Sequence, residues 1–414
     1  MLYLIHGYQI IKKINDNKCR LERKSNMATK KQTNGYFDFV GMIKGFGTES
    51  FKKDLLGTNN QNWVYSRLSV MLTDGNGKNI YVNMQDGYDR VKGKTIYAQT
   101  QDDQNMQISF ADRFNDGIRA VLKDSSFLKV ATRKIQVEAK DRNTGEVIME
   151  NGQPKMIEVW DYTRFLSLYD MVLFLSDKLT DGLKVRMTGQ VKYREYNGNT
   201  QREYNVQKVF FLPEDDETPC EFKITQTVIL DSDSVDSAKL DSDNVATLRA
   251  KIYQKKNKDE MMVLPLNLSI RTTPEKLESC KKGIDVLYSV TGDTLRKINL
   301  ECIVNSGYIQ TEATIDSIPQ EMQDLIDAGV FTKEDILKSY TNKEKVDELL
   351  VIKPVIRDGQ IDKDDAYYVK EDLENLMIVR EESEQRVQES TQQPQTQTQS
   401  FDGGFDLDKE LGLC

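Results

Sequence analysis

A long alternating stretch, NWVYSRLSVMLTDGNGKNIYVNMQ from Asn62 to Gln85, constrains the fold of this chain more than any other feature. A two-residue period is that of a β-strand, and Asp74-Gly75-Asn76-Gly77 in the middle is a strong turn signal. One face of the predicted hairpin is apolar and carries Val64, Leu68, Val70, Leu72, Ile80, Val82 and Met84. The opposite face carries Trp63, Tyr65, Arg67, Ser69, Met71, Tyr81, Asn83 and Gln85. Aromatic, basic and amide groups together suit stacking on a flat, negatively charged ligand.

A second long hairpin is predicted from Leu183 to Leu212, with its turn at Asn197-Gly198. Its core face carries Leu183, Val185, Met187 and Val191, and its outward face carries Lys184, Arg186, Lys192, Arg194 and Tyr196. The return strand adds Arg202, Tyr204 and Lys208 to that face. The alternation changes phase near Lys208, which predicts a β-bulge there.

The order of elements predicts an OB-fold over residues 35–213. A first strand (Gly35–Gly47), the first hairpin, a helix (Leu168–Leu179) and the second hairpin follow one another, and this is the connectivity of a five-stranded Greek-key barrel. An insertion of about residues 88–160 interrupts it. The same order returns over about 220–316, where a strand (Glu221–Leu230) precedes a hairpin, the helix Pro274–Tyr288 and a hairpin of Asp293–Val304 with Tyr308–Ile315. A second OB-like barrel is therefore expected.

The rest of the chain is expected to be helical or disordered. Residues 317–378 carry helical patterns in EMQDLIDAGV, TKEDILKSY, KEKVDELLVI and KEDLENLMIV, and residues 379–414 form a low-complexity linker and an acidic tail. Residues 1–34 are expected to be a disordered leader, and Met1–Asn26 to be a non-native extension, since Met27-Ala28-Thr29-Lys30-Lys31 resembles a cytoplasmic start. The predicted fold class is mainly β (α+β): two OB-like five-stranded barrels, a small helical region and a disordered acidic tail.

Charge is divided unevenly along the chain. Residues 27–213 contain 27 Lys and Arg against 22 Asp and Glu, whereas residues 214–414 contain 24 against 42. A mildly basic N-terminal part followed by a strongly acidic part is typical of nucleic-acid contact combined with an acidic tail. An acidic surface that only keeps the protein soluble would explain the acidic part, but it would not explain the segregation.

The usual enzyme and metal signatures are missing from the sequence. The five cysteines form no CxxC pair and the single histidine is His6, which argues against a zinc site or a Cys-His nucleophile. Phosphate-loop, GxSxG and HExxH motifs are absent. The run DSDSVD from Asp231 lacks the glycine and glutamate of a calcium loop. No membrane span and no secretory signal is predicted either. We therefore expect no cofactor, no metal and no enzymatic activity.

Bases interleaved with aromatic residues on two hairpins are typical of proteins that bind single strands, because every nucleobase can stack on an aromatic ring. The candidate stacking residues are Trp63, Tyr65, Tyr81, Tyr196 and Tyr204. The candidate phosphate contacts are Arg67, Lys184, Arg186, Lys192, Arg194 and Arg202. In the alternative interpretation, several of these aromatic side chains cap the barrel or pack against the insertion.

Taken together, these parts resemble the single-stranded DNA-binding proteins of replication and recombination, in the arrangement used by phages and bacteria. That family combines an OB-fold, a Gln/Pro-rich linker and an acidic tail that recruits partner proteins and competes with DNA. The resemblance implies a partner-binding tail here, with matching positions Phe401, Asp402, Phe405, Asp406, Leu407, Asp408, Glu410 and Leu411. The chain departs from the bacterial pattern by ending in Leu-Gly-Leu-Cys and by its size, which fits a large phage-type protein better.

The leading hypothesis is a non-catalytic protein that coats single-stranded DNA in the cytoplasm, which would be the host cytoplasm for a phage protein. A structural or virion assembly protein that uses OB-like barrels for protein contacts is the main alternative, because the fold hosts many functions. An RNA-binding barrel is a third possibility, and an enzyme is the last.

Overall fold

The computed structural model describes residues 32–141, 144–256, 260–311, 318–333, 336–337 and 342–365. The expected leader up to residue 31 and the expected linker and tail lie outside these residues. The chain is mainly β, as predicted. Its longer strands are β1 (Gly35–Ile43), β2 (Phe51–Leu56), β3 (Trp63–Thr73), β4 (Asn79–Asp89), β5 (Thr95–Gln99), β6 (Asn105–Ser109), β7 (Leu128–Glu138), β10 (Met156–Phe165), β11 (Lys184–Tyr196), β12 (Asn199–Phe211), β13 (Glu221–Leu230), β15 (Val245–Lys255), β16 (Met261–Arg271), β17 (Arg296–Thr311) and β18 (Asn342–Pro354). The helices are α2 (Asp116–Val121), α3 (Leu168–Lys178), α4 (Leu240–Asp243), α5 (Leu277–Leu287) and α6 (Gln320–Asp327). Short strands β8 (Met149–Glu150), β9 (Gln153–Pro154), β14 (Val235–Asp236), β19 (Ile356–Arg357), β20 (Gln360–Ile361) and β21 (Lys363–Asp364) complete the set.

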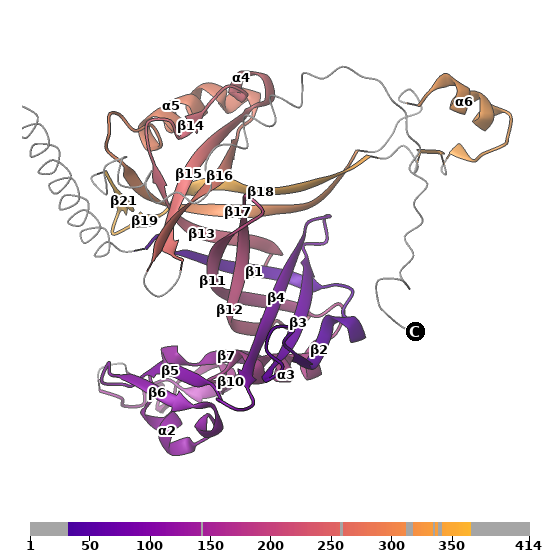
Figure 1. Ribbon diagram of the computed structural model, residues 1–414. Coiled ribbons are helices and arrows are strands. Elements are labelled where there is room, and N and C mark those ends of the chain that lie inside the picture. Colours follow the sequence, from indigo (N-terminus) through magenta and orange to yellow (C-terminus); the bar gives the residue numbers. More distant parts are fainter. Residues whose placement is uncertain are drawn as a thin grey trace, which may run out of the picture. The chain divides into compact units, whose positions relative to one another are not determined.

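The first barrel has the predicted connectivity. Strand β1 pairs with β11 along most of its length and meets β3 at Met42 and Ile43. Strands β3 and β4 form the first hairpin, β11 and β12 form the second, and α3 lies between them in the chain and packs on β3 and β4 (Figure 1). The alternating apolar residues fill the interior, since Leu68, Val82 and Met187 are buried completely.

The second barrel closes through five strands. Strand β13 pairs with β15 and with β17, β15 pairs with β16, and β17 pairs with β18. A parallel contact of Ser269 with Leu350 joins β16 to β18 and closes the ring. Helix α5 follows β16 in the chain, as an OB-fold requires. The prediction of a second OB-like barrel is confirmed at the level of this strand order.

The fifth strand of this barrel was assigned wrongly from the sequence. Residues 296–311 form the single strand β17, so the hairpin expected within 293–315 is wrong. Its partner β18 contains KEKVDELLVI, which was expected to be helical. Val346, Leu349 and Leu350 are spaced as on a helix. The backbone of this segment is nevertheless paired with β17 on one side and with β16 on the other. Tertiary pairing therefore overrides the local pattern, and the barrel takes its last strand from beyond residue 316.

Strand β1 of the first barrel also pairs with β13, a strand of the second barrel. One of its edges pairs with β11, and the other pairs through Gly35–Val40 with Glu221–Gln226 of β13. The ladder is therefore continuous from one barrel to the next.

The segment between β4 and α3 lies outside the five strands of the first barrel and ends at Phe165 of β10. Its hairpin β5–β6 packs through a cluster of buried side chains onto Tyr88 of β4 and Tyr169 of α3. Its ribbon β7–β10 extends the sheet of the first barrel, because Lys129–Ala131 pair in parallel with Lys208–Phe210 of β12. The insertion is thus attached on two sides.

Candidate nucleic-acid interface

The hairpin β3–β4 presents one face to the barrel interior and the other outward. Its register pairs Arg67 with Gln85, Ser69 with Asn83, and Met71 with Tyr81. We call the outward set the β3–β4 outer face; it comprises Trp63, Tyr65, Arg67, Ser69, Met71, Tyr81, Asn83 and Gln85. Tyr81 is 63% exposed, Arg67, Asn83 and Gln85 are exposed, and Trp63 and Tyr65 are half-buried. Within the described part of the chain, Arg67 has no ion pair or side-chain hydrogen bond.

A shallow pocket of about 340 Å³ lies at one end of this face, between Trp63, Tyr65, Gln85 and the loop Gly57–Asn60. The loop is fixed by backbone hydrogen bonds between Trp63 and Gly57 and between Trp63 and Asn60, both 2.9 Å long. Asn60 also donates a 3.1 Å hydrogen bond to Asp89. Hydrogen bonds from the Lys92 N–H, the Asn60 amide and the Val91 N–H lower the pKa of Asp89 below its ordinary value.

Gly87 lies directly across from Tyr65. A Cβ atom at this position would lie 2.1 Å from the Val64 carbonyl oxygen and 2.7 Å from the Cβ of Tyr65. Only glycine fits at this position, so β4 places no side chain opposite Tyr65.

Strand β2 adds a lysine that the sequence reasoning missed. Lys52 pairs with Arg67 across β2 and β3, so the two cations share one face. Lys52 forms a 3.1 Å ion pair with the exposed Glu49, a contact that contributes little in water. The strand escaped prediction because a bulge between Lys52 and Leu55, with Asp54 at a φ of 50°, breaks its alternation. Lysines on a short edge strand were the available signal.

The tip of the second hairpin carries three of the predicted residues. Tyr196 is 53% exposed, and the Arg194 guanidinium lies 5.7 Å from its ring centroid. Arg194 also pairs with Glu203 at 2.9 Å, whereas Lys192 is exposed and has no charged partner among the residues that the structure describes. The loop between strands four and five of an OB-fold, where this tip lies, commonly contacts oligonucleotides.

Four other predicted residues are engaged elsewhere. Arg186 binds Asp38 of β1 through two hydrogen bonds of 2.8 and 2.6 Å, and the Asp38 contact raises the pKa of Arg186. Lys184 donates a 2.6 Å hydrogen bond to the carbonyl of Asp216. Both cations are therefore already engaged, although Arg186 itself is exposed.

Arg202 and Tyr204 face inward. Arg202 is bound to Asp347 of β18, in the second barrel. The Tyr204 ring packs edge-on against Phe37 and Phe39, with centroid distances of 5.4 and 4.9 Å, and burial raises its pKa to about 12. Tyr204 is thus a packing residue, in line with the alternative interpretation of the aromatic set.

The second barrel contains a hairpin of the same length and register, β15–β16. Arg249 pairs with Asn267 there, at the positions that Arg67 and Gln85 occupy in β3–β4. Valine or threonine replaces the aromatic residues: Val245, Thr247 and Val263 stand where the first barrel has Trp63, Tyr65 and Tyr81. The cations are neutralised as well, by the pairs Arg249–Asp236, Lys251–Asp231 and Arg271–Glu348. At these positions the second barrel therefore lacks aromatic rings, and Arg249, Lys251 and Arg271 each have an acidic partner.

The acidic run from Asp231 is part of that neutralisation. Asp231 accepts hydrogen bonds from Ser234 Oγ at 2.8 Å and from the Asp233 N–H at 3.1 Å, besides its pair with Lys251. No group of His, Cys, Asp and Glu in the described residues has the geometry to hold a metal ion. The helices among those residues are all too short or too polar to cross a membrane.

The predicted partner-binding tail, Phe401, Asp402, Phe405, Asp406, Leu407, Asp408, Glu410 and Leu411, lies outside the described residues.

No protein-family model matches the sequence, and no curated protein matches it. Among solved structures, the fold is similar to the wild-type single-stranded DNA binding protein from Thermus aquaticus, with 10% sequence identity and a TM-score of 0.27 over 66% of this chain and 87% of that chain. A deletion mutant of the same protein gives 9% identity and a TM-score of 0.27 over 66% and 88%.

Proposed function

We propose that the protein binds single-stranded DNA on the β3–β4 outer face and coats exposed strands during replication or recombination, without catalysis. The observation that carries the proposal is Arg67, which has no partner among the described residues and lies between half-buried and exposed rings on a face that OB-folds use for oligonucleotides. Bases stack on Trp63, Tyr65 and Tyr81, and phosphates lie against Arg67, Lys52 and Lys192. We place this activity in the cytoplasm, which is the host cytoplasm if the protein is phage-encoded.

The contrast between the two barrels supports this assignment. Both present an arginine opposite an amide at the same register, but only the first barrel has aromatic neighbours and an arginine without an acidic partner among the described residues. Each stacked base contributes roughly 1–3 kcal/mol, largely independent of sequence. A face of this kind therefore holds a strand without reading its bases.

A scaffolding role predicts that the aromatic residues pack under the insertion. Tyr88 does so, stacking on Phe110 with centroids 4.8 Å apart. Tyr81 is on the same strand, but it points outward and is exposed. The exposed rings therefore favour DNA binding over the assembly role.

The role that we assign to the C-terminal tail is based on the family resemblance. We propose that Phe401, Phe405, Leu407 and Leu411, with the acidic residues between them, recruit replication or recombination proteins and compete with DNA for the cationic face. Deletion of residues 381–414 is then expected to tighten DNA binding. Unchanged or weaker binding would count against competition by the tail.

Titration of tryptophan fluorescence with oligo-dT tests the main proposal. Of the two tryptophans, Trp160 packs against Phe210 with centroids 5.3 Å apart, away from the proposed face. In a Trp160→Phe variant, the remaining Trp63 signal is expected to be quenched on binding, and the affinity is expected to fall steeply as salt rises. Absence of binding to oligo-dT at low salt, by titration and by gel shift, would overturn the proposal.

A further inference from the structure

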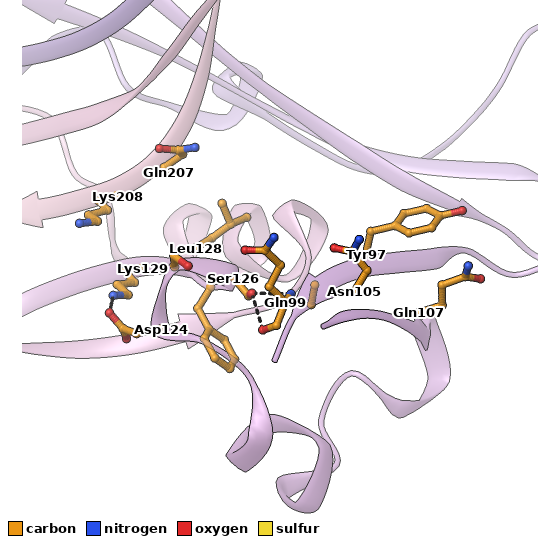
Figure 2. Close-up of a pocket in the computed structure, with 13 residues that line it drawn as sticks. Tyr97, Gln99, Asn105, Gln107, Asp124, Ser126, Leu128, Lys129, Gln207 and Lys208 are labelled. Carbon is orange, nitrogen blue, oxygen red and sulfur yellow. Dashed lines mark hydrogen bonds and ion pairs between the residues drawn. The ribbon is translucent and has the colours of Figure 1, made fainter. Parts of the chain in front are cut away.

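A second polar cavity lies between the insertion and the first barrel, away from the β3–β4 outer face. Its volume is about 980 Å³, at the upper end of the range of small-molecule sites. One wall is the outward face of β5–β6, and the other consists of β7 and the end of β12 (Figure 2). None of the nucleic-acid contacts predicted from the sequence lines this cavity.

A β-bulge aims two consecutive residues of β12 at this cavity. Thr188 of β11 pairs with Lys208, but the next residue, Gly189, pairs with Val206, so Gln207 is the extra residue. Both Gln207 and Lys208 are therefore exposed, whereas Val206 and Val209 on either side are buried. The bulge also depends on glycine at position 189, because a Cβ atom there would lie 2.0 Å from the Asn205 carbonyl oxygen.

The opposite wall is uncharged and carries an exposed ring. Cross-strand pairs Tyr97–Gln107, Gln99–Asn105 and Thr95–Ser109 make up the outward face of β5–β6. None of the six side chains is charged, in a chain where 30% of residues are. Tyr97 is 76% exposed. Amides can donate to and accept from the edge of any base, and an exposed ring beside them offers a stacking surface.

The two lysines that line the cavity, Lys129 and Lys208, differ in how readily they could contact a ligand. Lys129 is almost buried and bound to Asp124, and this bond holds the pKa of Asp124 below its usual value. Lys208 is exposed and makes no ion pair with any described residue. Figure 2 shows Lys208 and Lys129 on one side of the cavity and Tyr97 and Gln107 on the other. A phosphate on one side and a base on the other would match this separation.

The β5–β6 wall of the cavity is tied to β4 and to the start of α3. Lys94, at the start of β5, forms a 2.5 Å ion pair with Asp86 of β4. The same carboxylate accepts hydrogen bonds from Ser167 Oγ at 3.0 Å and from the Tyr169 N–H at 3.1 Å, at the start of α3. A site that is already formed costs less ordering free energy when a flexible strand binds.

We propose that this cavity is an additional subsite for single-stranded DNA, in which a base stacks on Tyr97 beside Gln107 and Asn105 while a phosphate contacts Lys208. The subsite rests on the proposed function and extends it, since a longer strand then occupies the β3–β4 outer face and the insertion together. The insertion thereby lengthens the binding site of the first barrel.

The test compares oligo-dT lengths in the full-length protein. Tyr97→Ala is expected to lower the affinity for long oligonucleotides about 5- to 150-fold and to leave the affinity for the shortest binding length unchanged. Tyr97→Phe keeps the stacking surface and is expected to behave like the wild type. Lys208→Ala is expected to reduce the slope of log K against log salt concentration by about 0.7 for long oligonucleotides only. Phe114→Ala, an exposed aromatic of the same insertion outside the cavity, is the matched control.

The outcomes separate the subsite from the proposed function. A length-dependent loss with Tyr97→Ala but not with Phe114→Ala supports the subsite, as does a cross-link from 5-iodouracil in a long oligonucleotide to the peptide that contains Tyr97. Binding that is equal in both variants at every length overturns the subsite and leaves the proposed function standing. Absence of wild-type binding at any length overturns the proposed function and the subsite with it.

Discussion

The hydroxyl of Tyr193, in the first barrel, donates a 2.8 Å hydrogen bond to the side-chain oxygen of Gln226, on the first strand of the second barrel. Gln226 is completely buried, and its amide N–H₂ donates to the carbonyl of Thr227. Both residues lie beside β1, the strand that links the two barrels by pairing with β11 and with β13. The contact therefore secures the junction on which the position of β11 and its tip depends.

Substitution of Tyr193 by Phe is expected to lower the free energy of unfolding by about 1–3 kcal/mol, because it leaves the buried Gln226 oxygen without a donor. Urea unfolding followed by circular dichroism measures the change. Tyr97→Phe, which removes the hydroxyl of an exposed tyrosine, is the matched control and should leave the midpoint unchanged. Equal midpoints for the two variants would contradict the role given to this bond.

The buried pair Asp231–Lys251 is expected to make the second barrel sensitive to acid. Burial alone would raise the pKa of Asp231, but the hydrogen bonds from Lys251 and Ser234 outweigh it and hold the pKa below its usual value. A pKa lowered in the folded state means that the stabilisation is present above about pH 4, the pKa of an unfolded aspartate, and is lost as pH falls further. Thermal unfolding at several pH values follows this loss.

Asp231→Asn provides the control for that pH dependence. The variant is expected to be about 3 kcal/mol less stable at pH 7, because it leaves Lys251 in a largely buried position without its partner. It should also lose less stability than the wild type between about pH 5 and pH 3. If the stability of Asp231→Asn falls with pH as steeply as that of the wild type, Asp231 is not the source of the acid sensitivity.

The periodicity of the sequence correctly predicts those features that depend on one strand or hairpin alone. The inner positions of β3 and β4 are buried as the alternation indicates, and the phase change near Lys208 is a real bulge. Interactions between residues that are far apart in the chain cannot be predicted from the periodicity of one strand. Asp38 neutralises Arg186 from 148 residues away, so a row of outward bases on β11 was indistinguishable from a free one. For the same reason the sequence predicts a helix within β18, whose strand partners β16 and β17 lie earlier in the chain.

Gly87→Ala is expected to destabilise the first barrel by about 1–3 kcal/mol, since the added Cβ atom overlaps the Val64 carbonyl and forces β3 and β4 apart beside Tyr65. Thermal unfolding measures the loss, and oligo-dT titration below the transition should show weaker binding as Tyr65 shifts. Gly47→Ala is the matched control, because no heavy atom lies within 4 Å of its added Cβ and its φ of −156° suits any residue. If both variants retain wild-type stability, the close packing of Gly87 against the Val64 carbonyl oxygen does not limit the residue at this position.

Arg67 and Arg249 provide the sharpest comparison, because they occupy the same register in equivalent hairpins. Arg67 has no acidic partner among the described residues, so Arg67→Ala should weaken oligo-dT binding and reduce the slope of log K against log salt concentration by about 0.7, the value for one phosphate contact on a single strand. Arg249 is bound to Asp236 at 2.7 Å, so Arg249→Ala should change neither quantity. Titrations at several salt concentrations give both slopes. Equal losses in the two variants would show that general positive charge, rather than the β3–β4 outer face, attracts the DNA.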